Sequence, residues 1–307
     1  PTMPTKTKNS KPIVGIIMGS DSDLTIMQAA ADQLTESDGT SRAKVVNLHL
    51  HFSNLCNMKC RSCGPRCSSA WIPDAKKLGW LKEDKKVYKI GSVEDQSNYD
   101  FIKDQIHNAE KIYFAGGEPL IMPEHWQTLD ILVEHGKFDV KLSYNTNCST
   151  LEYGKRNVVD YWLQWNPGCV DVWPSIDEFG PRAELIRAGT VWHQVEENLI
   201  TLANTENIYL RPGITVGAWN VFRLPELLEH LIGLGVIKPE HFHLNFFFNL
   251  LEEPKHYHIS ILPDEFRRST IQKLEDYFKE FESKYNLRLE TYKQDANDRL
   301  YFVYTKL

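Results

Sequence analysis

The chain of 307 residues lacks any apolar run long enough to span a bilayer, since such a span needs about 20 residues. It also lacks a dense run of Lys and Arg, and its formal net charge is −6, which argues against a nucleic-acid groove. The polar, basic residues 1–11 are not followed by an apolar signal core with a small-residue cleavage site. These absences predict a cytoplasmic protein that binds neither a membrane nor a nucleic acid.

Cysteine is scarce: the chain has six, and three of them lie within residues 56–63. A disulfide framework would spread cysteines in pairs through a short secreted chain, whereas clustered thiols in a reducing compartment more often bind a metal. Hydrophobic residues make up 42% of the chain, which is enough for an ordinary globular core. The composition therefore predicts a globular, metal-binding protein.

From residue 45 onward, segments with strand patterns alternate with segments of helical spacing. The strand patterns are 45–52, 112–114, 140–144, 170–176, 208–216 and 243–248, and a further one lies at 300–304. The helical patterns are 124–135, 151–164, 182–203, 224–234 and 263–285. Strands that alternate with helices pair in parallel, so we expect an α/β fold with a six-stranded sheet that curves into a partial (β/α)6 TIM-like barrel.

Cys56, Cys60 and Cys63 have the spacing CxxxCxxC and follow the first of these strands. Thiolates are soft ligands suited to iron–sulfur clusters, and a short loop can bring three of them to three irons of a [4Fe–4S] cluster. The fourth iron then has no protein ligand and is open to a cofactor or substrate. The alternative is a zinc site closed by Cys67 or a set of buried thiols. Cys67, Cys148 and Cys169 are isolated, and each is expected to be a core or surface thiol rather than a ligand.

A second motif, Gly116-Gly117-Glu118-Pro119, follows the second strand. Together, the two motifs resemble those of the radical S-adenosylmethionine (SAM) family. Residues 54–65 also fit the form Asn-Leu-Cys-Asn-x-Lys-Cys-Arg-x-Cys-Gly-Pro of its twitch-type subgroup. The resemblance covers residues 36–307. One departure is Ser62, where many members have an aromatic residue beside the adenine.

The resemblance implies where SAM would bind. Gly116, Gly117, Glu118 and Pro119 would hold its methionine amino group, with the glycines allowing a close approach of the backbone. Other strand ends would complete the site; the residues expected there are Asn145, Ser175, Asp177, Arg187 and Val216, with Thr215, Asn220 and Asn245 as further candidates. Ser175 and Asp177 would lie near the ribose and carboxylate, and Arg187 would pair with the carboxylate. The alternatives are an ordinary strand–helix turn at residues 116–119, a helix N-cap at Asp177 and a solvent ion pair at Arg187.

The implied activity is the reductive cleavage of SAM to methionine and a 5′-deoxyadenosyl radical, which removes hydrogen from a substrate. That substrate is expected to be a peptide or a small metabolite, and the electron is expected to come from an external donor such as flavodoxin or ferredoxin. No cysteine follows Cys169, so we expect no cysteine-rich domain for auxiliary clusters. The alternative is a non-catalytic metal-binding scaffold.

Residues 12–34 have a different character, with a short apolar strand, the turn Gly19-Ser20-Asp21-Ser22-Asp23 and a helical segment. They resemble the start of the purine-pathway carboxyaminoimidazole ribonucleotide mutase, in which this turn binds the nucleotide substrate. One strand and one helix cannot build that active site, so mutase activity is only an alternative function. We therefore expect residues 1–44 to be a disordered arm, an extra strand–helix fragment and a linker, and residues 45–307 to be the radical SAM core.

Overall fold

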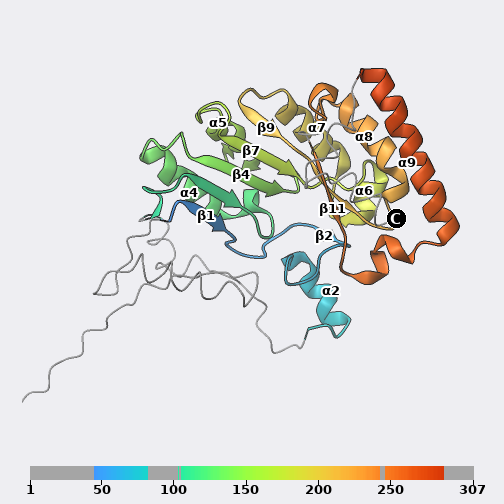
Figure 1. Ribbon diagram of the computed structural model, residues 1–307. Coiled ribbons are helices and arrows are strands. Elements are labelled where there is room, and N and C mark those ends of the chain that lie inside the picture. Colours follow the sequence, from blue (N-terminus) through green and yellow to red (C-terminus); the bar gives the residue numbers. More distant parts are fainter. Residues whose placement is uncertain (1–44, 82–102, 104, 243–245, 287–307) are drawn as a thin grey trace, which may run out of the picture. The chain divides into compact units, whose positions relative to one another are not determined.

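The computed structural model describes residues 45–81, 103, 105–242 and 246–286 (Figure 1). The chain divides into two compact units, Pro1–Val46 and Asn47–Leu307, and every element named below belongs to the second. The predicted mutase-like segment 12–34 and the predicted strand at 300–304 lie outside the described residues. The expected division of the chain into residues 1–44 and 45–307 stays a prediction.

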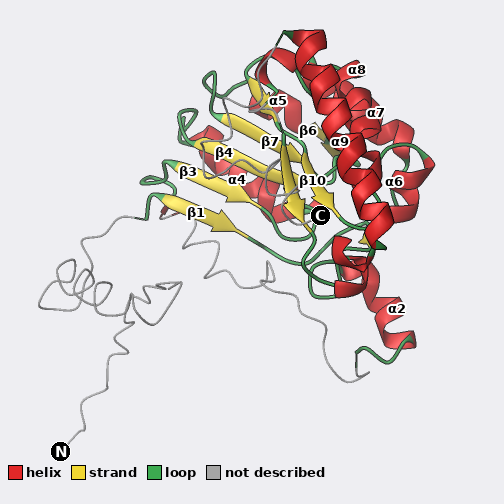
Figure 2. Ribbon diagram, turned by 45° about the vertical axis from the view of Figure 1, so that its right-hand side comes forward, coloured by secondary structure: helices red, strands yellow, loops and turns green. Residues whose placement is uncertain are grey.

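A parallel sheet of five strands forms the centre of the second unit (Figure 2). Its strands follow the order β1 (Asn47–Leu50), β3 (Lys111–Phe114), β4 (Lys141–Thr146), β7 (Val170–Pro174) and β9 (Ile208–Leu210). Two more parallel strands, β10 (Gly213–Val216) and β11 (Phe247–Leu250), pair with each other. A parallel bridge between Ser175 and Gly213 connects the two sheets. The predicted α/β class with parallel strands is confirmed.

The described strands do not close into a barrel, because no pairing within residues 45–81, 105–242 and 246–286 joins β11 to β1. The predicted fifth strand, 208–216, is broken into β9 and β10 at Arg211 and Pro212. Pro212 has no backbone N–H to donate, which fits its place at the break.

One face of the sheet is apolar because side chains alternate along each strand. In register across the sheet, this face carries Leu48, Ile112, Leu142 and Val170, followed by Phe114, Tyr144, Val172 and Leu210. All eight are buried and belong to one hydrophobic core, which also contains residues of α4 (Pro123–Glu134), α5 (Val158–Trp162), α7 (Trp192–Ala203) and α8 (Leu224–Gly233). The opposite face carries polar and aromatic side chains such as His49, Tyr113 and Asp171.

Two predicted helices differ from the structure. The segment 151–164 begins with a hairpin of β5 (Glu152–Tyr153) and β6 (Arg156–Asn157), and only α5 is helical. Gly154 has a φ of 64°, a left-handed conformation that suits the tight turn of this hairpin. The longest helix, α9 (Asp264–Tyr285), agrees with the pattern at 263–285 and ends at Asn286, which is left-handed with a φ of 52°.

The segment 182–203 is also broken, into α6 (Pro181–Ile186), β8 (Arg187–Ala188) and α7. Gly189 has a φ of 104°, and a Cβ atom there would lie 2.7 Å from the carbonyl oxygen of Asn57. A continuous helix therefore cannot pass through this position. Instead, β8 pairs in antiparallel fashion with β2 (Lys59–Cys60). The break brings Arg187 directly opposite Cys60.

Candidate functional site

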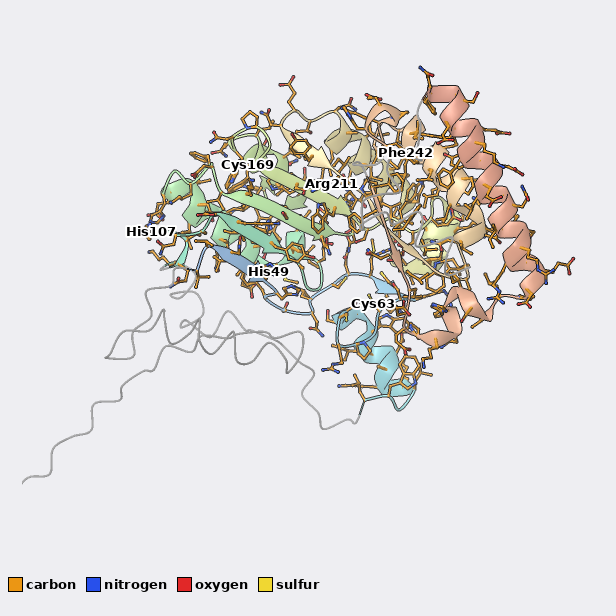
Figure 3. All side chains as sticks on the ribbon, viewed as in Figure 1. His49, Cys63, His107, Cys169, Arg211 and Phe242 are labelled. Atoms are coloured by element: carbon orange, nitrogen blue, oxygen red, sulfur yellow. The ribbon has the colours of Figure 1, made fainter. Side chains whose placement is uncertain are left out.

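The three motif cysteines lie on the loop that follows β1, at the carboxyl edge of the parallel sheet. Strand β2 and the short helix α2 (Ile72–Lys77) are the regular elements of this segment, together with a 3-10 turn at Ser69–Trp71. Cys60 is buried, Cys56 is half-buried and Cys63 is exposed. Figure 3 shows Cys63 at the end of the sheet toward which the strands point, and Cys169 at the opposite end. Cys169 is thus separated from the motif, as the sequence predicted.

The cysteine loop is fixed by hydrogen bonds to its own backbone. Ser68 Oγ donates to the carbonyl oxygen of Met58 at 2.6 Å, and Trp71 Nε1 donates to that of Cys60 at 3.0 Å. The pairing of β2 with β8 holds the same stretch from the other side. The conformation of the loop therefore depends on protein contacts as well as on any bound group.

Gly116 and Gly117 support this loop by allowing it to lie directly on the end of β3. A Cβ atom on Gly116 would lie 2.8 Å from the carbonyl oxygen of Ser53, and one on Gly117 only 2.0 Å from that of Leu55. The backbone N–H groups of Gly117 and Glu118 donate to those same two oxygens, at 3.1 and 2.7 Å. Glycine is therefore required at these two positions because the cysteine loop packs directly against them. This requirement is separate from any close approach of a cofactor.

Glu118 is buried, with 1% of its surface exposed, and three groups of the protein donate to its carboxylate. These donors are the backbone N–H of Asn147 at 2.6 Å, Thr146 Oγ1 at 2.8 Å and the backbone N–H of Leu120 at 3.2 Å. Burial raises the pKa of Glu118 to about 7, although these hydrogen bonds act in the opposite direction. Its side chain thus ties the turn after β3 to the end of β4. Its predicted contact with the SAM amino group stays a prediction.

Donors of the protein point at two of the three sulfur atoms. Arg187 Nη1 lies 3.5 Å from Cys60 Sγ, and the backbone N–H of Met58 lies 3.5 Å from Cys56 Sγ. A hydrogen bond from the Cys63 thiol and the charge of Arg187 lower the pKa of Cys60, whereas burial raises the pKa of Cys56. Such donors stabilise a thiolate, the form in which cysteine binds a metal.

Arg187 is held by a buried ion pair with Asp177. Its Nη2 and Nε atoms lie 2.8 and 2.9 Å from Asp177 Oδ2, and Asp177 is 1% exposed. The other carboxylate oxygen of Asp177 accepts from the backbone N–H of Thr215 at 2.8 Å. The sequence offered a solvent ion pair for Arg187 and a helix N-cap for Asp177, and both alternatives are wrong. Arg187 instead lies between Asp177 and the sulfur of Cys60.

The remaining predicted cofactor residues are spread along the carboxyl ends of the strands. Pro119 begins a buried 3-10 turn, Pro119–Ile121, and Val216 is fully buried in the hydrophobic core. Ser175 is half-buried and forms the bridge to Gly213. Asn145 Oδ1 is buried and has no hydrogen-bond partner in the described structure. The structure thus gathers Cys56, Cys60, Cys63, Gly116, Gly117, Glu118, Asp177 and Arg187 around the loop; Asn245 lies outside the described residues.

Sequence reasoning missed the part played by two asparagines. Asn147 Nδ2 donates to Asn57 Oδ1 at 2.8 Å and lies 4.0 Å from Cys56 Sγ, while Asn57 Nδ2 donates to Ser149 Oγ at 2.8 Å. These bonds join the cysteine loop to the end of β4. The available signal was the position of Asn57 inside the motif and of Asn147 at a strand end.

Within the described residues, no group of three or more His, Cys, Asp or Glu side chains is arranged to hold a single metal ion. All four cysteines from Cys56 to Cys67 are among the residues searched, so the structure bears out neither the zinc alternative nor the predicted cluster, and both stay predictions. The thiols of Cys60 and Cys63 are hydrogen-bonded to each other, whereas in a cluster the three thiolates would bind separate irons. The donor set of three thiols with protein donors at two sulfurs fits a cluster of that kind.

The sequence matches no protein-family profile and no curated protein sequence. Its structure is similar to that of Streptococcus suis SuiB bound to the precursor peptide SuiA, with a TM-score of 0.50 and 12% identity over 91% of this chain. The fold resembles that of SuiB. The chain covers 56% of the length of SuiB in that structure. A second SuiB structure, bound to S-adenosylmethionine, has a TM-score of 0.48, 12% identity, and coverages of 90% and 53%.

Across the described part of the chain, none of the helices combines the length and the apolar character that crossing a membrane would require.

Proposed function

We propose that this chain is a radical SAM enzyme in which Cys56, Cys60 and Cys63 bind a [4Fe–4S] cluster. The observation that carries the proposal is the cysteine loop itself. It lies at the carboxyl edge of a parallel sheet, where α/β proteins bind their ligands. When bound, the cluster and SAM supply a one-electron cleavage of a carbon–sulfur bond and a radical that removes a substrate hydrogen.

The residues of the chain would serve this chemistry by positioning and charge. Arg187 donates to Cys60, and Asp177 holds the guanidinium in place through a buried ion pair. Asn147 links the loop to Glu118, so that the ends of β3 and β4 form one support beneath Cys56. The polar strand ends near Asn145 and Ser175 would then contact SAM. For the fold, we propose a partial (β/α)6 barrel of the twitch type.

We further propose that the substrate is a peptide. SuiB, to which this fold is similar, is described in a structure with a precursor peptide. A peptide would lie against the polar and aromatic face of the sheet, near Tyr113 and Trp173, whose rings are 5.7 Å apart. A small metabolite is the alternative substrate.

The first experiment measures the metal. We expect anaerobically reconstituted protein to hold about four irons and four sulfides per chain, with the broad visible absorption of a [4Fe–4S] cluster. The single changes Cys56→Ala, Cys60→Ala and Cys63→Ala should each abolish this content. Cys169→Ala, at the opposite end of the sheet, is the matched control and should retain it.

The second experiment tests the reaction. With dithionite and SAM, the reconstituted protein should release 5′-deoxyadenosine even without substrate, and the three cysteine variants should not. Tightly bound zinc without iron, or iron-loaded protein that neither binds nor cleaves SAM, would show the proposal to be wrong.

A further inference from the structure

The outer side of the cysteine loop forms one wall of a surface cavity of about 550 Å³. Its lining includes Lys59, Arg61, Cys63, Trp71, Trp80 and His256. Cys63, the exposed member of the three cysteines, therefore opens toward this cavity. A molecule bound there would touch the segment that carries the proposed metal ligands.

The cysteine segment is basic within an acidic protein. Residues 59–77 contain five cationic side chains, Lys59, Arg61, Arg66, Lys76 and Lys77, and Asp74 is their one carboxylate, whereas the whole chain has a net charge of −6. Lys59 forms an ion pair with Asp74 at 2.7 Å. Arg66, Lys76 and Lys77 are exposed. This local excess of positive charge favours an acidic partner.

Apolar surface lies beside these charges. Trp80 is 62% exposed and Leu78 is 58% exposed, although tryptophan and leucine are usually buried. The rings of Trp71 and Trp80 are 6.2 Å apart, so the two side chains form one aromatic surface at the cavity. Tryptophan and arginine are enriched among the residues that contribute most to binding at protein interfaces.

We propose that this surface, formed by Arg61 and Trp80 at the cavity beside Cys63 and by the exposed Arg66, Lys76 and Lys77 of the same segment, is the docking site for a small acidic one-electron carrier protein. The inference rests on the proposed function and names the partner of the same site. The carboxylates of the carrier would contact the lysines and arginines, and its redox group would face Cys63. One electron would pass from the reduced carrier to the proposed metal centre at Cys63; no bond would form or break and no proton would be transferred.

Direct binding tests the site without any need for catalysis. The probe is an acidic flavodoxin, titrated calorimetrically into the full chain at low and at high ionic strength. We expect the double change Lys76→Glu and Lys77→Glu to weaken binding roughly tenfold at low salt, and we expect the difference to shrink as salt is added, because exposed charges are screened. Trp80→Ala should weaken binding at both ionic strengths.

The matched control reverses two exposed charges elsewhere, Arg268→Glu and Lys279→Glu on α9. It changes the net charge by the same amount and should leave the affinity within about twofold of the unmodified protein. Equal weakening by both double variants would show only a general charge effect, and unchanged affinity in the Lys76 and Lys77 variant would place the carrier elsewhere. Either result overturns the docking site.

Activity separates this inference from the proposed function. If the docking site is correct, the Lys76 and Lys77 variant loses 5′-deoxyadenosine release with reduced flavodoxin and keeps it with dithionite. If the unmodified, iron-loaded protein releases no 5′-deoxyadenosine with dithionite, the proposed function is contradicted instead. If the variant retains flavodoxin affinity and loses the binding of an acidic peptide, the cavity is a peptide site and the docking proposal is wrong.

Discussion

The helix-covered face of the sheet and the cysteine loop at its edge are built in different ways. The covered face consists of apolar side chains in register, such as Ile112, Leu142 and Val170, and each of them is fully buried. The loop is held by individual hydrogen bonds, a two-residue strand pair and one buried ion pair. The stability of the covered face is therefore distributed over many similar contacts, whereas single residues determine the geometry of the cysteine loop.

This difference predicts two kinds of response to mutation. A substitution in the covered face should lower the free energy of unfolding but leave the proposed metal site intact in every folded molecule. A substitution of a residue that supports the loop should remove the proposed metal site. The following changes test this distinction, from the largest expected effect to the smallest.

Gly117→Ala should have the largest effect. The added Cβ atom would lie 2.0 Å from the carbonyl oxygen and 2.5 Å from the carbonyl carbon of Leu55, both backbone atoms that a rotamer change cannot move. The cysteine loop must shift, and iron incorporation should be lost. Gly64→Ala, in the same loop, is the control because nothing lies within 4 Å of its added Cβ. Normal iron content in the Gly117 variant would show that the packing of these glycines does not determine the loop.

Arg187→Gln should lower the free energy of unfolding by about 3 to 5 kcal/mol, because it leaves Asp177 buried without its ion-pair partner. The same change removes the donor to Cys60, so the reduction potential of the bound cluster should fall. Arg187→Lys keeps the charge and should restore part of the stability. Chemical denaturation measures the change in stability, and a redox titration measures the change in reduction potential. If Arg187 had only a structural role, the substitution would change the stability and leave the reduction potential unchanged.

Glu118→Gln tests a residue that supports the cysteine loop, through the pH dependence of the free energy of unfolding. The pKa of Glu118 in the folded protein is raised to about 7 by burial, above its ordinary value of 4.5. Its contribution to stability is therefore present below about pH 4.5 and is lost as the pH rises through 7, by about 3 kcal/mol in total. The variant should lack this decline when unfolding is measured between pH 5 and pH 8.

His125→Phe tests a residue packed against the covered face, and here the free energy of unfolding should change with pH in the opposite sense. His125 is fully buried among Phe114, Trp126 and Tyr144, and burial lowers its pKa from 6.5 to about 3. Stability is thus present above pH 6.5 and falls as the pH decreases, by about 2 kcal/mol at pH 5. The variant should lose less stability than the parent protein between pH 7 and pH 5, with iron content unchanged at pH 7. An identical slope would mean that other groups control the acid response.

The sequence predicted the covered face better than the loop. Period-two alternation identified the strand at 45–52, and burial on one face gives β7 the same alternation. It also placed Cys56, Cys60 and Cys63 after the first strand. It did not predict the breaks at Gly154 and Gly189, since helical spacing continues across both and each break is caused by a single left-handed residue.

The contacts of the loop were beyond sequence reasoning because they join residues far apart in the chain. Nothing in the spacing of Arg187 indicates that it meets Cys60, and helix periodicity alone placed it within a helix. The pairing of β2 with β8 arises only once the helix breaks at Gly189. The same reason explains why sequence reasoning did not identify Asn147 as a neighbour of Asn57.

That distance along the chain has a consequence during synthesis. Cys60 leaves the ribosome 127 residues before Arg187, its donor in the folded protein. At typical rates of about 5 to 20 residues per second, the motif cysteines wait roughly 6 to 25 seconds for the strand that holds them. We therefore expect nascent chains arrested before β8 to take up iron and sulfide poorly, and chains arrested after α7 has emerged to take them up well. Cluster delivery would then follow the emergence of β8 and α7, and the reactive thiols would need protection from oxidation until that point.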